Sequence, residues 1–408
     1  MSAKQPSPSA SAAPATHKEN PVNTHRSLRP ARALAAAGVL ALAATGLAAC
    51  GEDTAAPAAS SSGAVSNPAL AAEVEALTKP LDAYPVPTTA VDASAHKGKT
   101  LYYIPITMQS PQFAVTQKTL TAAAQAVGLS VQVCDGKGTP TDVSSCVQQA
   151  TKANAGTIIT DAVPYGLAAN AFDAAQEANI PVIISNQVPD EKHPASKTLD
   201  YIAAGGTGMQ EALAKWVSLD SGGKANVLIN QSTDGPSPAV FVAAGKKVYD
   251  ADCAGCTVTV NEVSSANFSL IPSSTSSALL KDPNVNYVMS QFEQYLQATQ
   301  SGVQQANKIS AVKGLTGSTQ LSGLKQLAAG NFLYAAAAQA SAYQGWVDVD
   351  AALRLMSGTE VPEYTIPVRL FTRDSVKDVN LSSEAEASGE WFGPATFTDE
   401  FQKLWGAQ

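Results

Sequence analysis

From Thr100 onward, the chain alternates between short apolar runs rich in β-branched and aromatic residues and longer stretches with apolar residues at helical spacing. Three helical stretches, each roughly 10–15 residues long, separate the first four runs. The four predicted strands cover residues 100–107, 129–134, 156–160 and 181–185. Strands that alternate with helices of this length form βαβ units, which build a parallel sheet. This part of the chain is therefore predicted to form a doubly wound α/β lobe.

The same alternation restarts after residue 200. Further strands are predicted over residues 201–204, 225–230, 257–263, 285–290, 309–314 and 332–337, with helices between most of them. Two successive sheets of this kind imply two lobes, with the loops at the carboxyl ends of the strands facing the crevice between them. We therefore predict an α/β protein with two doubly wound parallel-sheet lobes and a ligand cleft between them.

The N-terminus has the features of an export signal. A basic lead precedes an uncharged apolar run at residues 33–49, which ends at Leu47-Ala48-Ala49-Cys50. The cysteine at the cleavage point resembles the bacterial lipobox, which implies cleavage before Cys50 and acylation of that residue. A transmembrane helix is the alternative, because seventeen apolar residues lie at the lower limit for a span. We expect residues 1–49 to be a lipoprotein signal peptide and the mature chain to be lipid-anchored at the extracytoplasmic face of the cell membrane.

Removal of the signal peptide makes the chain more acidic. Residues 1–49 hold five basic residues and one acidic residue, so cleavage changes the formal net charge from −8 to −12. A net acidic protein without basic tracts lacks the electrostatic attraction that binds nucleic acid or anionic lipid. We therefore expect no nucleic-acid partner, and contact with the membrane through the lipid anchor only.

Besides Cys50, the mature chain contains Cys134, Cys146, Cys253 and Cys256. An even number in an exported protein predicts two disulfides, for which three connectivities are possible. Proximity in the sequence favours Cys134–Cys146 and Cys253–Cys256. The Cys-Ala-Gly-Cys motif of the second pair also fits a redox site or half of a zinc site, but it has no second copy and the mature chain has only two histidines. We predict structural bridges, with no metal and no cofactor.

Small and polar residues dominate 51–68, and such a composition cannot bury enough apolar surface to offset the entropy of ordering. Residues 69–97 are ambiguous, with a possible helix over 69–78 followed by three prolines. We predict a flexible tether over residues 50–97 and a folded part that begins near Gly98.

Four short motifs follow one another in a characteristic order. They are Met108-Gln109-Ser110-Pro111-Gln112-Phe113 after the first strand, Gly314-Leu315-Thr316, Gln339 six residues before Gly345, and the stretch 367–374 with Val376 beyond it. In order and spacing over about residues 99–376, they resemble the type I periplasmic-binding-protein family, in particular the ribose/galactose-type receptors of ABC importers.

This resemblance implies a chain that crosses between its lobes three times and closes a cleft by hinge motion. One lobe would contain residues 98–203 plus 340–365, and the other 204–339 plus 366–379. The tail 380–408 is extra, and its aromatic density predicts packing along one lobe; a strip for docking a partner is the alternative. These aromatic residues are Trp391, Phe392, Phe397, Phe401 and Trp405.

The resemblance also implies a function. It predicts a monomeric solute-binding lipoprotein that captures a small molecule, a sugar or sugar-like compound, and delivers it to ABC permease subunits. A sensory receptor of the same fold, reporting to a membrane kinase or chemoreceptor, is the alternative. The sequence contains no G-x-S-x-G nucleophile elbow, no H-E-x-x-H and no P-loop, so we predict that it is not an enzyme.

Positions that match the family's motifs supply the candidate ligand contacts. Aromatic faces cover the apolar side of a sugar ring, and polar groups bind its hydroxyls. Asp161 is the candidate charged acceptor, although it could instead cap the following helix. Phe113 and Phe268 are candidate stacking residues, although either could be part of a core. The full set is Ser110, Phe113, Asp161, Phe268, Gln291, Thr316 and Gln339.

Besides Gln112, which stands where an aromatic residue is common, the departures from the family's pattern reduce charge. Val242 stands where the family commonly has an arginine, Gln291-Phe292 where it has Asn-Asp, and Thr316 where it has an aspartate. Without these charge-assisted contacts, the pocket is predicted to favour a less polar or differently substituted ligand over a free hexose or pentose.

Overall fold

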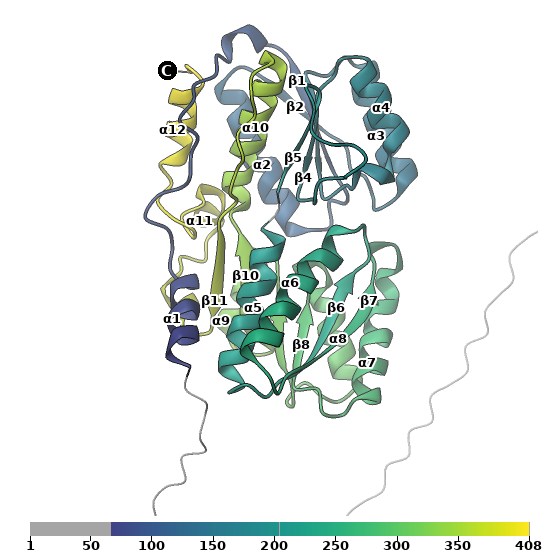
Figure 1. Ribbon diagram of the computed structural model, residues 1–408, viewed down its shortest axis with the longest axis vertical. Coiled ribbons are helices and arrows are strands. Elements are labelled where there is room, and N and C mark those ends of the chain that lie inside the picture. Colours follow the sequence, from purple (N-terminus) through teal and green to yellow (C-terminus); the bar gives the residue numbers. More distant parts are fainter. Residues whose placement is uncertain (1–66, 204, 408) are drawn as a thin grey trace, which may run out of the picture. The chain divides into compact units, whose positions relative to one another are not determined.

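The computed structural model describes residues 67–203 and 205–407, whose strands form two sheets (Figure 1). The first sheet has five parallel strands in the order β2-β1-β3-β4-β5. Its strands are β1 Thr100–Pro105, β2 Ser130–Val133, β3 Thr157–Asp161, β4 Val182–Ser185 and β5 Leu199–Ile202. We call this sheet and its helices the first lobe.

The second sheet has the order β11-β10-β9-β8-β6-β7, and only the edge strand β11 is antiparallel to its neighbour. Its strands are β6 Asn226–Ser232, β7 Thr257–Val263, β8 Tyr287–Ser290, β9 Lys313–Thr316, β10 Leu333–Gln339 and β11 Val368–Thr372. This sheet and its helices form the second lobe. The predicted architecture of two doubly wound parallel-sheet lobes is confirmed.

Helices cover both faces of each sheet (Figure 1). The first lobe has α2 Pro111–Ala126, α3 Pro140–Lys152, α4 Ala169–Glu177 and α10 Ser341–Ser357; the second has α5 Gly206–Asp220, α6 Ser237–Asp252, α7 Ile271–Lys281, α8 Leu296–Gln305 and α9 Leu321–Ala329. Short 3-10 helices are η1 Ser94–His96, η2 Tyr165–Leu167, η3 Ser265–Leu270, η4 Glu293–Tyr295 and η5 Ser375–Asp378. The flanking helices are α1 Pro68–Leu77, α11 Ser383–Ser388 and α12 Phe397–Leu404.

The period of two along each strand assigns its side chains to the two helical layers. In β6, Val227 and Ile229 join the core beneath α5 and α6, whereas Leu228 joins the core on the opposite face. The central strands are buried on both faces, which explains their nearly continuous apolar runs.

Between β1 and β11, the chain passes between the lobes three times: from β5 to α5, from β10 to α10, and from α10 to β11. Two hydrogen bonds tie these crossings together. Ala340 N–H donates to Pro367 O at 2.8 Å, and Gly205 N–H donates to the Gln339 side-chain oxygen at 3.0 Å. The crossings therefore form one narrow bundle, as a hinge requires.

The segment before the first sheet differs from the predicted tether. Residues 50–66 lie outside the described part, but α1 is capped by Asn67, whose Oδ1 accepts from Leu70 N at 3.1 Å. Leu70 and Val74 are buried in the core of the second lobe, and Tyr84 is stacked on Tyr343 of α10. Enough apolar side chains recur in this region to offset its ordering entropy.

The C-terminal tail also differs from its prediction, because it packs on both lobes. Trp391 and Phe392 lie against Phe371 of β11 in the second lobe. Trp405 stacks on Trp346 of α10 in the first lobe, with ring centroids 5.4 Å apart. All five aromatic residues of the tail are buried.

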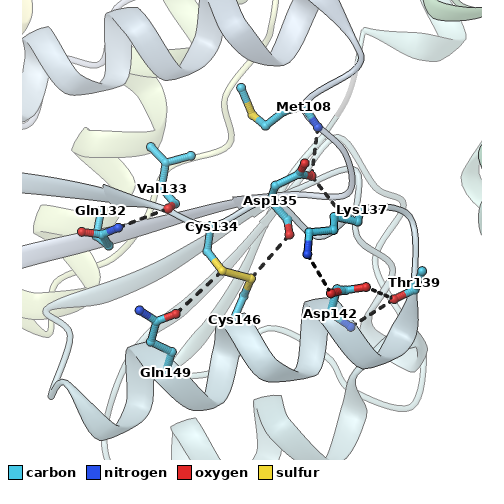
Figure 2. The surroundings of a disulfide bond; sticks show 10 residues. All are labelled: Met108, Gln132, Val133, Cys134, Asp135, Lys137, Thr139, Asp142, Cys146 and Gln149. Carbon is cyan, nitrogen blue, oxygen red and sulfur yellow. Dashed lines mark hydrogen bonds and ion pairs between the residues drawn. A yellow bond between two sulfur atoms is a disulfide. The ribbon is translucent and has the colours of Figure 1, made fainter. Parts of the chain in front are cut away.

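The structure pairs Cys134 with Cys146 and Cys253 with Cys256, the connectivity that sequence proximity favours. Figure 2 shows the first bridge, which joins the loop after β2 to α3. Cys253 is at the carboxyl end of α6, where the helix dipole disfavours a thiolate. This position favours a structural bridge over a redox site.

We expect that replacing Cys253 and Cys256 together by alanine lowers the free energy of unfolding by about 2 kcal/mol, because the bridge closes only a short loop. Urea denaturation measures this loss. The same double replacement at Cys134 and Cys146, whose sequence separation is 12, serves as the comparison and should cost more. A larger loss for the shorter loop would contradict the chain-entropy argument.

Among the described residues, no helix is long and apolar enough to cross a membrane. The predicted signal peptide and Cys50 lie outside these residues.

Candidate functional site

A small cavity of about 50 Å³ lies between the two lobes, at the carboxyl ends of the strands. The first lobe contributes the loops after β1, β3 and β4, and the second contributes the starts of α5 and α6 and the loops after β6, β8 and β9. Its lining residues are Ile106, Ser110, Gln112, Phe113, Ala162, Asn186, Gln187, Gly206, Met209, Ser232, Asp234, Pro238, Phe241, Phe292, Gln294, Ser318 and Gln339.

The lobes touch across this cavity. Ser237, the first residue of α6, donates its hydroxyl to Gln187 Oε1 at 2.5 Å and accepts from Val188 N at 2.9 Å. The backbone of Gly235 lies against the ring of Pro164. The contact is so close that a Cβ on this glycine would be only 2.9 Å from the proline ring. These contacts join the second lobe to loops of the first, so the structure has a closed cleft.

Much of the cavity wall is apolar. Phe113 comes from α2, Phe241 from α6 and Phe292 from the loop after β8, with Met209 beside them. The Phe241 ring packs on Gly206, where any side chain would clash with it. Because these groups are aromatic or aliphatic, the cavity can bury the apolar part of a ligand.

A chain of side-chain amides lies at the hinge side of the cavity. Gln339 donates to Asn186 Oδ1 at 2.9 Å and to Gln344 Oε1 at 2.6 Å, while its own oxygen accepts from Gly205 N. Asn186 in turn donates to Asp161 Oδ1 at 2.6 Å. The orientation of two cavity-lining amides is therefore set by the hinge and by Asp161.

Asp161 is fully buried and does not line the cavity. Its position in β3 shares a face with Ile159, so its side chain lies in the layer under α10, where Tyr103 donates to Oδ2 at 2.6 Å. Burial raises the pKa of Asp161 to about 6, and the hydrogen bonds from Tyr103, Asn186 and Gln344 oppose this increase. The carboxylate orients Asn186 rather than facing a ligand in this structure.

A second carboxyl group, Asp348 of α10, is buried near Asp161. Its Oδ1 accepts from Ser185 Oγ at 2.6 Å. Burial, and then the negative charge of Asp161, raises the pKa of Asp348 well above its ordinary value. Two buried carboxyl groups without a nearby cation favour a protonated state for Asp348.

Three predicted contacts, Ser110, Phe113 and Gln339, line the cavity, and their contact with a ligand stays a prediction. Gln291 instead lies in the wall, where it accepts from Ser232 N at 2.7 Å and donates to Pro238 O at 2.8 Å. Thr316 is buried behind the wall, and Phe268 is partly exposed beside Tyr295.

Sequence reasoning missed Asn186, Met209 and Asp234, and it also missed several neighbours of residues that it considered. Phe292 follows Gln291, Phe241 precedes Val242, and Ser318 follows Thr316 by two positions. Val242 itself belongs to the core of the second lobe. The register of the strand or helix decides which of two neighbouring side chains faces the cleft. In a strand, a shift of one residue turns the side chain to the opposite face.

The backbone is strained at three points of the cavity wall. Ala162, Asn186 and Ser318 line the cavity with φ of 57°, 59° and 53°, in the left-handed region that favours glycine. Each directly follows a strand or comes two residues after one. Strained backbone of this kind is concentrated at functional sites.

The only carboxylate among the lining residues is Asp234, and no lysine, arginine or histidine is among them. Asp234 already accepts hydrogen bonds from Ser265 N at 3.0 Å, Ser265 Oγ at 2.7 Å and Tyr295 OH at 2.6 Å. An anionic ligand would therefore find no counter-ion among these residues, and the one acidic group already binds neutral donors.

The sequence model described as "Periplasmic binding protein domain" matches residues 101–360. The chain belongs to this family. Among curated proteins, no sequence matches this chain significantly.

Solved structures of ABC-transporter solute-binding proteins have the same fold. One from Agrobacterium vitis, bound with α-D-tagatopyranose, is 20% identical, has a TM-score of 0.62, and is matched over 69% of this chain and 96% of its own. The 5-methylthioribose transporter solute-binding protein from Thermotoga lettingae is 16% identical and has a TM-score of 0.63. The match covers 76% of this chain and 100% of that protein. A glucose-galactose binding protein from Geobacillus stearothermophilus is 15% identical and has a TM-score of 0.60. The match covers 68% of this chain and 98% of that protein.

Proposed function

We propose that this protein captures an uncharged sugar or sugar-like molecule with an apolar substituent and delivers it to the permease subunits of an ABC importer. The observation that supports this most directly is the composition of the cavity wall. Three phenylalanines and Met209 face a set of neutral amides and hydroxyls, and no basic side chain is among them. Such a wall suits a ring with hydroxyls on one side and an apolar group on the other.

We further propose that the lobes move as two rigid bodies about the three crossings. Residues 98–203 plus 340–365 would form one body, and 204–339 plus 366–379 the other. In this scheme Ser110, Phe113 and Gln339 contact the ligand directly, whereas Asp161, Gln291 and Thr316 support their neighbours.

We also propose that Cys50 carries the lipid that holds the protein at the extracytoplasmic face of the cell membrane. The motif Leu47-Ala48-Ala49-Cys50 after an apolar run supports this. Cells fed a clickable palmitate analogue should label the wild-type protein and not the Cys50→Ala variant. Equal labelling of the two would refute the anchor.

A thermal-shift comparison tests the ligand class. A ligand that binds only the folded state raises the melting temperature, and at a fixed ligand concentration the shift increases with the logarithm of the affinity. We expect 5-methylthioribose to bind roughly tenfold more tightly than ribose, because its methylthio group adds buried apolar surface. Ribose or galactose binding at least as tightly would overturn the proposed preference for an apolar substituent.

Two aromatic residues provide a matched pair for mapping the site. Phe113 is buried and lines the cavity, whereas Phe268 is about one-third exposed and does not. We expect Phe113→Ala to weaken binding roughly tenfold or more and Phe268→Ala to leave the affinity unchanged. Isothermal titration with the tightest ligand of the thermal-shift comparison measures both. The reverse order would place the site elsewhere.

A further inference from the structure

Two segments outside the family match run beside each other along both lobes (Figure 1). They are residues 78–97 and 380–407, which we call together the strap. Leu81 N–H donates to Phe392 O at 2.7 Å, and Val91 N–H donates to Leu404 O at 3.0 Å. The two segments are thus bonded to each other at both ends.

The first lobe holds the strap through a buried ion pair on α10. Arg354 and Asp350 are 2% and 0% exposed and 2.8 Å apart. Arg354 also donates to Thr89 O at 2.6 Å, and Asp350 accepts from the Trp405 indole N–H at 2.7 Å. One ion pair therefore binds both segments of the strap.

In the second lobe, an arginine of β11 binds the strap in addition to the aromatic contacts of Phe371. Arg369 donates from Nε to Thr78 O at 2.8 Å and from its terminal nitrogen to Trp391 O. Its guanidinium also lies 4.9 Å from the centre of the Phe371 ring. Arg369 therefore binds both segments at their other end.

The span between these anchors is stiff. Pro80, Pro85 and Pro87 fix the backbone of the first segment, and Tyr84 is packed between Tyr343 and Phe397. A rotation of the lobes would move α10 relative to β11 and strain these contacts, whose buried members are costly to break. The strap is thus placed to resist hinge motion.

We propose that the strap restrains the hinge and keeps the lobes near the closed arrangement when no ligand is bound. A receptor with a larger closed fraction binds its ligand with higher apparent affinity. This inference rests on the contacts of the strap, so it stands or falls independently of which ligand the cavity takes.

Distance measurements between the lobes test the restraint without any ligand. Nitroxides at Lys152→Cys of α3 and Lys281→Cys of α7 report on the separation of the lobes, because both positions are exposed. The full chain carries Cys50→Ser so that only the two new thiols react. We expect one narrow distance distribution in the dialysed protein, and an added longer-distance population in the Arg369→Ala variant.

Arg373→Ala is the matched control. Arg373 lies in the same lobe, donates to Leu333 O at 2.7 Å and stacks on Tyr334, and so contacts no strap residue in these interactions. It should leave the distribution narrow. A broad distribution in the unmodified chain, or no difference between the two arginine variants, would overturn the restraint.

A milder substitution at the anchor in the first lobe tests the same proposal with less risk that the variant misfolds. Trp405→Phe removes the hydrogen bond to Asp350 and keeps an aromatic ring in the cluster. We expect it to add the same longer-distance population while circular dichroism remains that of the wild type. A folded Trp405→Phe protein with an unchanged narrow distribution would contradict the proposal.

Discussion

Replacing Asp350 by alanine is expected to lower the free energy of unfolding by about 3–5 kcal/mol. The change leaves the guanidinium of Arg354, 2% exposed, without its anion. It also removes the acceptor of the Trp405 indole and of the Tyr364 hydroxyl, which lies 2.5 Å from Asp350 Oδ2. An unpaired buried charge and two unpaired buried donors each cost free energy, so the loss should far exceed that of a surface ion pair.

Asp374→Ala provides the comparison. Asp374 pairs with Lys377 at 2.7 Å, but their side chains are 93% and 71% exposed, so water and salt screen the interaction. Urea denaturation of both variants measures the difference. Similar losses for Asp350→Ala and Asp374→Ala would show that the buried pair does not hold the tail to α10 as the structure indicates.

Asp161→Asn is expected to remove a pH dependence from the stability. The pKa of Asp161 is about 6 in the folded protein and about 3.9 in the unfolded chain. The folded state therefore binds the proton more tightly, so the contribution of Asp161 to stability is full below about pH 4 and is lost as the pH rises through 6. Two pKa units correspond to about 3 kcal/mol.

Urea denaturation of both proteins is carried out at several pH values from 4 to 8. At each pH, the free energy of unfolding of the wild type is subtracted from that of the variant. We expect this difference to rise by about 3 kcal/mol in favour of Asp161→Asn. Asp348 has a raised pKa of the same sign and is present in both proteins, so subtraction removes much of its contribution. A difference that is constant across this range would contradict a buried, titrating Asp161.

The fold could be read from the sequence because periodicity is a local property. The apolar runs at 100–107, 156–160 and 181–185 match the observed strands β1, β3 and β4 to within two residues at each end. The run at 309–314 was less accurate, since β9 covers Lys313–Thr316 and the preceding residues form a turn. Element order was predictable, whereas the ends of elements depend on tertiary contacts.

The site was only partly predictable for a related reason. Phe113 and Gln339 line the cavity where the motifs placed them, but Asp161 lies behind Asn186. Asp161 ends β3, and Asn186 directly follows β4. The pairing of these two strands and their packing against α10 decide which of the two side chains reaches the cleft. Sequence motifs identify which loops line the cavity, whereas strand register decides which residue of a loop faces it.

By itself, the sequence determined the alternation of strands and helices and the two-lobed architecture, because these depend on local spacing. Only the tertiary structure revealed that residues 78–97 and 380–407 join the lobes. The contacts responsible connect residues far apart in the chain, such as Trp405 with Asp350 and Arg369 with Thr78. No local pattern specifies such a pair, since its free energy arises only when folding buries both partners together.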